Sequence, residues 1–494
     1  SVRQVANSFT RVNELDLALE AYVRGHKLVK DGQSFHFEIA NIHAMKGDVQ
    51  KMVIAYMDLL PANEAYLQSV QNSLSRYMDF EKIDERSDLL RTELLRRIQK
   101  EPQRTIFHEL LIWMYIQQKD LGAALIQSKA MDKRFDEGGT RLMELAQIAL
   151  SNQDFSTAFK CYEYVLSLSR NDANYIEARI GAVKTRYAEL TSMPEPSRGD
   201  LEDLDQRASN TLQELGLNKQ TVDLIRDRAL LKAYYLNDQA GAMALLEEGI
   251  ELPQIDPKTR AQLKLDLGDV HLLHGDIWEA SLLYSQVDLD YKYDVIGHDA
   301  RLRNAKVSFY AGDFLWSQAQ LSILKASTSK LIANDAMELS LRITDNLGLD
   351  SNATPLSYYA KAELLRFQHR YDESLAVLDS LQLEYPIHSL GDDILYERFR
   401  IAAARHRHEE AAGYLEKVLE LYPLDILVDN ALLDLGKLYE DKLKDPLKAQ
   451  HYYERLLFEQ TGSIFVPEAR DRFRRLRGDK LDAPAEPAAP QTHP

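Results

Sequence analysis

The sequence has almost no cysteine, no long apolar run and no excess of basic residues. Its 494 residues include one cysteine, Cys161, which excludes an intrachain disulfide and any zinc or iron–sulfur site built from several cysteines. No stretch of about 18 consecutive apolar residues occurs, so we expect no transmembrane helix. The 60 lysines and arginines are outnumbered by 77 aspartates and glutamates, and the net charge of −17 argues against nucleic-acid binding.

Motifs of the common enzyme and cofactor-binding classes are also missing from the sequence. It contains no GxxxxGK[ST] or GxGxxG phosphate-binding loop, no HExxH and no GxSxG. His271 and His274 lie three residues apart on a predicted helix, but no third ligand lies near them in sequence. We therefore expect no enzymatic activity, no cofactor, no metal ion and no small-molecule substrate, and we interpret Cys161 as an inert core thiol.

Helix signals run along nearly the whole chain. Apolar residues recur at spacings of three and four, helix-forming residues dominate, and Gly, Asp and Asn fall between the helical segments. At this length a single compact core is not expected, which leaves several domains or a repeat array. The pattern predicts an all-α protein.

A unit of two helices joined by a short turn recurs along the chain. The clearest copy runs from Leu267 to Tyr284, with its turn at Gly275-Asp276, and the frame returns 37 residues later at Gly312-Asp313. In the N-terminal half the period is 34 residues, as between the turns at Lys119-Asp120 and Gln153-Asp154. Such self-similarity is the signature of a solenoid, here of about 11–12 helical hairpins.

Small and aromatic residues keep fixed places in this frame. A small residue early on the second helix lets the two helices approach closely, and a tyrosine four residues later fills the space between hairpins. The alanines are Ala18, Ala124, Ala158, Ala280, Ala411 and Ala449, and the tyrosines are Tyr22, Tyr56, Tyr162, Tyr284 and Tyr453. Gly268 gives the same close approach on a first helix. We therefore assign the tyrosines to the core rather than to an aromatic binding surface.

This pattern resembles the tetratricopeptide repeat (TPR) family, whose hairpins stack into an α-α superhelix. We divide the chain into N-terminal TPR-like repeats (1–172), irregular hairpins with a long loop (173–256), C-terminal TPR-like repeats with a terminal cap (257–477) and a flexible Pro/Ala-rich tail (478–494). The long loop is expected at 193–199 and an extra helix near 329–347. One more hairpin is expected between about 64 and 101.

The C-terminal third is similar to a narrower group, the bacterial periplasmic and outer-membrane-associated TPR proteins. The segments that carry this similarity are Tyr385-Pro386, Tyr422-Pro423, 429–436 and 465–470. The resemblance implies a periplasmic or envelope-associated location, with the cytoplasm as the alternative. Lipoproteins of this group carry an acylated cysteine at the mature N-terminus, whereas here Ser1 stands first and Cys161 is internal, so the sequence departs from the lipoprotein pattern at this point.

The TPR resemblance implies that the first helices of the hairpins line a concave face that binds a partner protein or peptide. The expected function is a non-enzymatic interaction scaffold, with a permanent subunit of a larger secretion or membrane-associated complex, or a regulatory subunit of an enzyme, as alternatives. The expected groove residues are Asn41, Glu109, Trp113, Gln147, Asp269, Lys306, Tyr359, Glu363, Tyr396 and Arg400. Trp113, Tyr359 and Tyr396 are the expected hot spots. A basic run near the C-terminus either caps the last hairpin or docks an acidic partner, and it comprises Arg470, Arg472, Arg474, Arg475 and Arg477.

Overall fold

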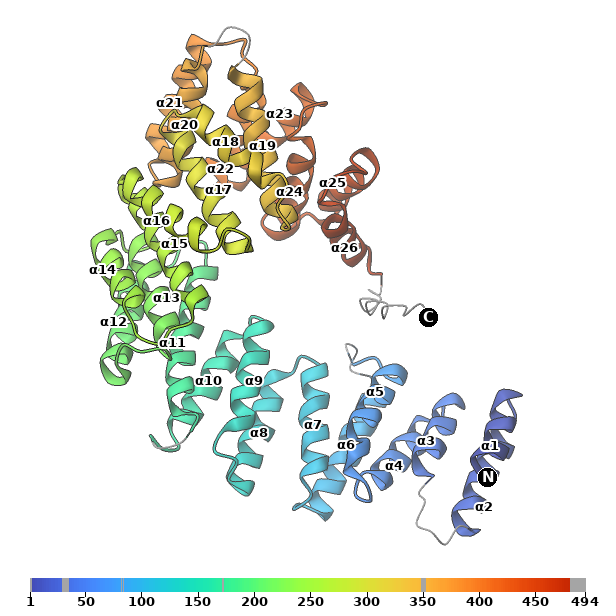
Figure 1. The fold of residues 1–494 in the computed structure, drawn as a ribbon. Helices are drawn as coiled ribbons and strands as arrows, with labels where there is room; N and C mark the ends of the chain where they lie inside the picture. The colour runs from blue at the N-terminus through green and yellow to red at the C-terminus, as the bar shows by residue number, and fades with distance from the viewer. Residues whose placement is uncertain are drawn as a thin grey trace, which may run out of the picture. The chain divides into compact units, whose positions relative to one another are not determined.

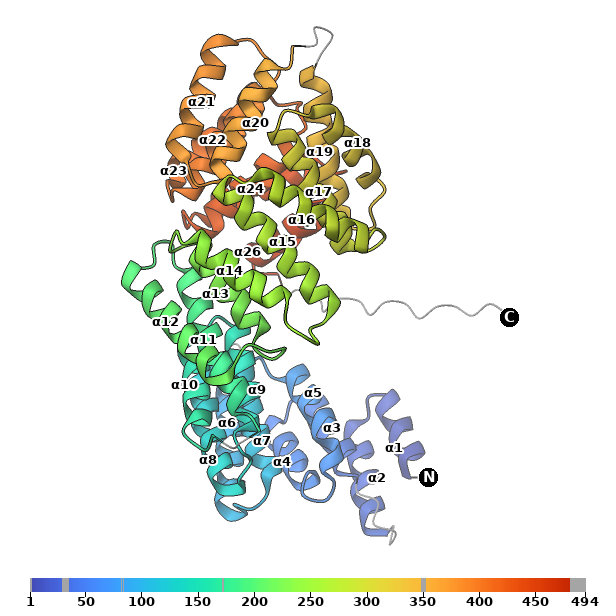
Figure 2. The ribbon, with the colours of Figure 1, turned by 60° about the vertical axis from the view of Figure 1, so that its left-hand side comes forward.

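The computed structural model describes residues 2–28, 35–80, 82, 84–170, 173–347 and 352–479. These residues form 26 α-helices and one short 3-10 helix, and no β-strand occurs among them (Figures 1 and 2). The all-α prediction is therefore confirmed. No helix in the described ranges is long and apolar enough to cross a membrane. Most of the predicted tail, from residue 480 onward, lies outside the described residues.

The chain divides into two compact units, Ser1–Leu215 and Gly216–Pro494, and the boundary falls inside the segment 173–256. Unit 1 contains α1 (Val2–Arg11), α2 (Leu15–Leu28), α3 (His36–Met45), α4 (Val49–Leu59), η1 (Glu64–Tyr66), α5 (Leu67–Tyr77), α6 (Glu85–Lys100), α7 (Thr105–Gln117), α8 (Leu121–Phe135), α9 (Thr140–Ser151), α10 (Phe155–Leu166), α11 (Tyr175–Ser192) and α12 (Arg198–Leu215). Unit 2 contains α13 (Val222–Tyr234), α14 (Gln239–Ile250), α15 (Pro257–His274), α16 (Ile277–Asp290), α17 (Val295–Tyr310), α18 (Phe314–Leu324), α19 (Lys330–Leu347), α20 (Thr354–Phe367), α21 (Tyr371–Glu384), α22 (Gly391–Ala404), α23 (His408–Leu421), α24 (Val428–Asp441), α25 (Pro446–Glu459) and α26 (Val466–Arg477).

Consecutive helices pack in pairs as antiparallel hairpins. Eleven such pairs occur in the described residues, and each packs on the next within its unit, except that α5 and α6 lie between α3/α4 and α7/α8. They are α1/α2, α3/α4, α7/α8, α9/α10, α11/α12, α13/α14, α15/α16, α17/α18, α20/α21, α22/α23 and α24/α25. Helix α26 closes the series against α25. The predicted helical-repeat solenoid of TPR-like hairpins is therefore confirmed.

The turns inside the hairpins share one backbone design. A residue with a positive φ angle, such as Gly47, Lys119 or Gln153, stands two positions before the start of the second helix. The next residue is the N-cap of that helix. In most hairpins the N-cap is an aspartate whose carboxylate accepts a backbone N–H of the first turn, as Asp120 does from Ala123 at 2.9 Å. Such N-caps stabilise a helix start by about 1 kcal/mol. This local chemistry explains why the repeat frame is visible in the sequence.

The predicted core positions are confirmed. All six alanines are fully buried, and the five tyrosines are at most 2% exposed. Two of the tyrosine rings lie against a glycine of the first helix of their own hairpin: a Cβ atom on Gly268 would stand 2.5 Å from Cε1 of Tyr284. Gly436 faces Tyr453 in the same way. The glycine on the first helix is therefore what admits the tyrosine ring from the second.

Three segments depart from the regular frame. The predicted hairpin at 64–101 is wrong in its packing, because α5 and α6 form no close pair of their own and α6 packs on α4 and α7. The interruption at 193–199 is a short connection between the 18-residue helices α11 and α12. The predicted extra helix is present as α19, which packs mainly on α18 and also contacts α17 and α20.

Candidate functional site

Three of the expected groove residues are bonded to the repeat tyrosines. The hydroxyl of Tyr56 donates to the side chain of Asn41 at 2.7 Å, and that of Tyr284 donates to Asp269 at 2.7 Å. The amide of Gln147 donates to the hydroxyl of Tyr162 at 3.0 Å. In each case the two residues lie 15 positions apart on the two helices of one hairpin. These polar groups satisfy buried hydroxyls and hold the hairpin together.

Asn41, Trp113 and Gln147 belong to unit 1 and do not form a common site there. The indole of Trp113 packs edge-on against Phe80, with ring centroids 5.2 Å apart. Glu109 lies 3.5 Å from the guanidinium of Arg141, which also binds Glu137. In unit 1 the expected groove positions therefore make contacts within the chain, and those of Glu109 and Trp113 reach residues outside their own hairpin.

The six expected residues of unit 2 lie together around the inserted helix α19. Lys306 comes from α17, Tyr359 and Glu363 from α20, and Tyr396 and Arg400 from α22, while Asp269 on α15 lines an adjoining cavity. Helix α19 supplies Arg342 and Glu338 to the same place. We call this set of charged and aromatic side chains the α19 cluster.

Arg342 lies at the centre of the α19 cluster and is 6% exposed. Its Nε donates to Oδ1 of Asp393 at 2.6 Å, and a terminal nitrogen donates to Oε1 of Glu338 at 3.0 Å. The guanidinium also stands over the ring of Tyr359, 5.2 Å from its centroid. Burial disfavours the charged form, but the surrounding carboxylates outweigh it and raise the pKa of Arg342 above its usual value.

A second group of ion pairs is centred on Glu397, which is fully buried. One of its carboxylate oxygens accepts from Nε of Arg366, and the other lies 3.5 Å from the guanidinium of Arg400. Arg400 in turn stands over the ring of Tyr396, 4.8 Å from the centroid. Carboxylates and guanidinium groups from α19, α20 and α22 are thereby joined into one buried network.

The two expected tyrosine hot spots do not offer a surface to a partner. Tyr359 and Tyr396 are 1% and 3% exposed, and the hydroxyl of Tyr396 donates to Asp434 at 2.5 Å. An interface hot spot must be reachable before binding, so this part of the expectation is wrong for both rings. Tyr359 is covered by Arg342 of α19, whereas Tyr396 is buried in the core formed by α22 to α26. The rings instead support the arginines of the α19 cluster.

Two adjoining cavities open onto the α19 cluster. The larger is about 320 Å³ and is lined by α15, α16, α17, α19 and α20, and the smaller is about 100 Å³. Lys306, Asp335 and Glu363 line both. Lys306 makes no ion pair within the described part of the chain. Oε2 of Glu363 has no hydrogen-bond partner among these residues either, although Glu363 is only 7% exposed.

Glu363 is ionised in this surrounding. Burial raises the pKa of its carboxyl, but Arg342, Arg366, Arg400 and Lys306 together lower the pKa below its usual value. Its Oε1 accepts a long bond of 3.5 Å from the hydroxyl of Tyr310, while Oε2 stays without a donor. The residues that line the cavities therefore include one ammonium group without an ion pair and one buried carboxylate with an oxygen that has no donor among the described residues.

One carboxyl beside the α19 cluster makes stability depend on pH. Burial, followed by the nearby carboxylates of Asp393 and Asp425, raises the pKa of Asp392 to about 7. The unfolded value is about 3.9, so the folded protein binds this proton more tightly and loses stability as pH rises from about 4 to 7. We expect Asp392→Asn to raise the free energy of unfolding by roughly 1–3 kcal/mol at pH 8 and by almost nothing at pH 4.

The measurement is urea denaturation of both proteins at a series of pH values. Asp290→Asn, on an exposed position of α16, serves as the control and should leave the pH dependence unchanged. A stability difference between Asp392→Asn and wild type that stays constant over the whole pH range would contradict the assignment.

The basic run at the C-terminus is divided between the two expected roles. Arg472 pairs with Glu440 at 2.8 Å and with Asp441 and Glu468 at 3.3 Å, so it ties α26 to α24. Arg477 pairs with Asp479 just beyond the helix end. The other members, Arg470, Arg474 and Arg475, are exposed and make no ion pair among the described residues. Capping is thus observed for Arg472, and docking at the exposed members stays a prediction.

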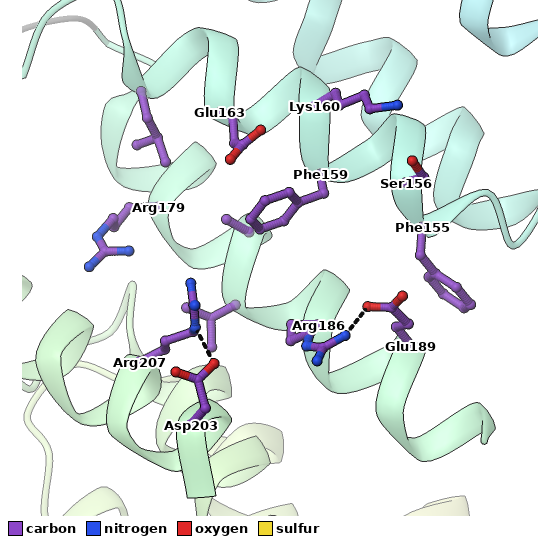
Figure 3. A pocket seen from close by; sticks show the side chains of 13 residues that line it. Phe155, Ser156, Phe159, Lys160, Glu163, Arg179, Arg186, Glu189, Asp203 and Arg207 are labelled. Atoms are coloured by element: carbon purple, nitrogen blue, oxygen red, sulfur yellow. Dashed lines mark hydrogen bonds and ion pairs between the residues drawn. The ribbon is translucent and has the colours of Figure 1, made fainter. Parts of the chain in front are cut away.

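A cavity of unit 1 lies among α10, α11 and α12 and measures about 570 Å³ (Figure 3). Phe155 and Phe159 contribute its apolar part. Its three arginines already have carboxylate partners: Arg186 binds Glu189 at 2.7 Å, Arg207 binds Asp203 at 2.6 Å, and Arg179 binds Glu214 at 3.1 Å. The charges of the three arginines are therefore satisfied within the chain.

The residues considered for metal or thiol chemistry make ordinary contacts. The rings of His271 and His274 both face Oδ2 of Asp276, at 3.4 and 2.9 Å. No group of three or more potential metal ligands occurs in the described ranges. Cys161 is fully buried, and burial raises the pKa of its thiol to about 12. The thiol therefore stays protonated and unreactive near neutral pH.

Neither a protein-family model nor a curated protein matches the chain. Among solved structures it is similar to a tetratricopeptide repeat protein from Parabacteroides merdae, with 13% identity, a TM-score of 0.34, and 62% of this chain and 100% of that one covered. It is also similar to yeast Tom70, with 12% identity, a TM-score of 0.33, and 95% and 98% covered. A human IFIT1 dimer with m7Gppp-AAAA matches at 12% identity and a TM-score of 0.30, with 93% of each chain covered.

Likenesses this distant carry no argument about what the present chain binds. The assignment as a TPR-like helical repeat protein rests on its own hairpins, turns and core positions. The expectation that the chain does not bind nucleic acid stays a prediction that rests on its negative charge.

Proposed function

We propose that the chain is a non-enzymatic scaffold that binds a charged segment of a partner protein at the α19 cluster. The observation that carries this proposal is the pair of unsatisfied groups in the cavities, the ammonium of Lys306 and Oε2 of Glu363. An unpaired buried acceptor costs about 1–3 kcal/mol, so a donor that reaches Oε2 of Glu363 would stabilise the network. A ligand that brings an anionic group to Lys306 and an N–H donor to Glu363 would complete the network.

The size and position of the cavities fit a peptide rather than a large cofactor. About 320 Å³ is at the lower end of the range for ligand pockets, and it accommodates one or two side chains. Five helices line the larger cavity, and three of them, α15, α17 and α20, are first helices of hairpins. A partner segment lying along these helices would insert its charged side chains here.

The test is affinity capture of partner proteins from the native host by wild type and two variants. Lys306→Glu reverses the free ammonium, and we expect it to reduce capture of the specific partner by about tenfold or more, because loss of a charged contact costs about 1.4 kcal/mol or more. Lys361→Glu makes the same charge change on an exposed position of α20 and should capture normally. Equal loss from both variants would indicate a net-charge effect, and equal capture by all three proteins would remove the α19 cluster from the binding site.

The bacterial envelope is the location we propose for this scaffold, on the strength of the C-terminal segments that resemble periplasmic TPR proteins. Fractionation of the native host tests this location, and recovery in the cytoplasmic fraction would exclude it.

Permanent membership of a larger secretion or membrane-associated complex is the alternative function. A partner that stays bound at fixed stoichiometry through size-exclusion chromatography would favour that alternative over a transient adaptor.

A further inference from the structure

Two arginines of the α19 cluster are held in the same way. Arg342 donates to Asp393 at 2.6 Å and stands over the ring of Tyr359, 5.2 Å from its centroid. Arg400 stands over the ring of Tyr396, 4.8 Å from its centroid, and lies 3.5 Å from a buried carboxylate of its own helix. A carboxylate that binds the guanidinium and a tyrosine ring that covers its face are thus used twice in this cluster.

The same kinds of group meet a third time at the two cavities of the α19 cluster, around Glu363. Its Oε1 accepts from the hydroxyl of Tyr310, which lines the larger cavity. Its Oε2 has no donor among the described residues, although the residue is only 7% exposed. Asp335 on α19 also lines both cavities and makes no ion pair or hydrogen bond within the described part of the chain. Two acceptors from two helices therefore line one space that no donor of the described residues fills.

The charge around this space favours a cation. The residues that line the two cavities include as many carboxylates as cationic groups. Two further buried carboxylates, Asp393 and Glu397, bind the arginines of the same walls from behind. The surroundings are therefore negative overall, and a cationic group placed beside Glu363 and Asp335 complements them.

We propose that this space takes the guanidinium of an arginine side chain of the partner, which donates to Oε2 of Glu363 and to the carboxylate of Asp335. The inference rests on the proposed function, in which the same partner segment also brings an anionic group to Lys306. A guanidinium suits two acceptors on different helices better than an ammonium does, because its donors form a planar fork. Since Lys306 lines the same cavities, an arginine beside an aspartate or glutamate fits better than a run of basic residues.

Isothermal titration of the full chain with short blocked peptides tests this inference. The first peptide has adjacent arginine and aspartate residues between glycines, and in the second citrulline replaces arginine, which keeps the shape without the charge. We expect the first to bind with a Kd of roughly 1 mM and the second to bind at least about tenfold more weakly. Equal binding of the two peptides, or no binding of the arginine peptide at about 10 mM, would overturn the inference.

A free amino acid could supply the same guanidinium and carboxylate without a partner protein, so free L-arginine is titrated as well. We expect it to bind more weakly than the arginine peptide. Tighter binding of free L-arginine than of the peptide would overturn the assignment of the guanidinium to a partner segment.

Asp335→Asn locates the bound guanidinium, and Asp345→Asn is its matched control. Both residues lie on α19, but Asp345 is exposed and is not among the residues that line the cavities. We expect Asp335→Asn to weaken binding of the arginine peptide about tenfold and to leave binding of the citrulline peptide unchanged. Asp345→Asn should bind both peptides as wild type does. Equal weakening of both peptides by Asp335→Asn would overturn the inference, and circular dichroism checks that each variant is folded.

Capture of the partner by Lys306→Glu separates this inference from the proposed function. Loss of capture by that variant, together with no binding of the arginine peptide to wild type, would leave a partner at the cavities but overturn arginine recognition. Binding of the arginine peptide, together with normal capture by Lys306→Glu, would support arginine recognition and overturn the partner site.

Discussion

Replacing Arg342 with methionine should destabilise unit 2 by about 3–5 kcal/mol, the largest effect that we expect from one substitution. The guanidinium is buried, binds Asp393 at 2.6 Å and Glu338 at 3.0 Å, and covers the ring of Tyr359. Its removal leaves the carboxylate of Asp393 buried without its cation, at a position only 7% exposed. The cost comes from that unpaired charge rather than from the loss of a favourable contact, because desolvation offsets most of the gain of a buried ion pair.

Urea denaturation followed by circular dichroism measures this effect, and two further variants locate its cause. Arg370→Met removes an arginine from an exposed pair with Glu373, with side chains 51% and 57% exposed, and should cost less than about 1 kcal/mol. The double variant Arg342→Met/Asp393→Leu removes both buried charges and should recover most of the lost stability. If the double variant is no more stable than Arg342→Met, the unpaired carboxylate is not the cause.

Gly268→Ala should cost about 1–3 kcal/mol, which is the second large effect and tests how the repeats pack. The added methyl would stand 2.5 Å from the ring of Tyr284, which is fully buried and bonded to Asp269. The added methyl must therefore either displace the ring, at the cost of its hydrogen bond to Asp269, or separate the two helices of the hairpin. Gly436→Ala should have an effect of similar size, because Gly436 faces Tyr453 in its own hairpin.

Gly413→Ala is the matched control for these glycine variants. Gly413 also lies within a helix, α23, but a Cβ atom there would meet nothing within 4 Å. Alanine is the better helix former, so this change should stabilise the protein by about 0.5–1 kcal/mol. The midpoint of thermal unfolding should therefore fall for Gly268→Ala and Gly436→Ala and rise for Gly413→Ala. If Gly413→Ala destabilised the protein as much as Gly268→Ala does, the cause would be the loss of backbone freedom at glycine and not a clash with the tyrosine ring.

The repeat architecture is predictable from the sequence because its determinants are local. Turn residues such as Gly47-Asp48 and buried positions such as Ala280 and Tyr284 act within one hairpin, so each copy carries its own signal. The region of α5 and α6 breaks that rule. Its helices pack on neighbours at a distance in sequence, which periodicity alone does not reveal.

Only some residues of the α19 cluster could be predicted from the sequence. The frame identified Lys306, Glu363 and Arg400 as inward-facing, but it missed Arg342 and Asp393, because charged residues on an amphipathic helix usually face water. The burial of these charges follows from the insertion of α19 against α17 and α20, a tertiary arrangement with no repeat to predict it.

One signal for this cluster does stand in the sequence. The spacing Glu-x-x-Arg occurs at Glu363 and Arg366 and again 34 residues later at Glu397 and Arg400, on the first helices of consecutive hairpins. The step between these two hairpins is 37 residues, so the two pairs do not occupy equivalent positions of the repeat, although both lie on first helices.

Photo-cross-linking from position 306 tests the central claim, that a partner binds at the α19 cluster. A photoreactive amino acid replaces Lys306 in one variant and Lys361, exposed on α20, in the other. Each variant is irradiated with the captured partner, and the cross-linked peptides are identified by mass spectrometry. The account predicts that one defined segment of the partner, carrying charged side chains, is linked from position 306 and not from position 361. Cross-links from position 361 alone, or the same products from both positions, would contradict it.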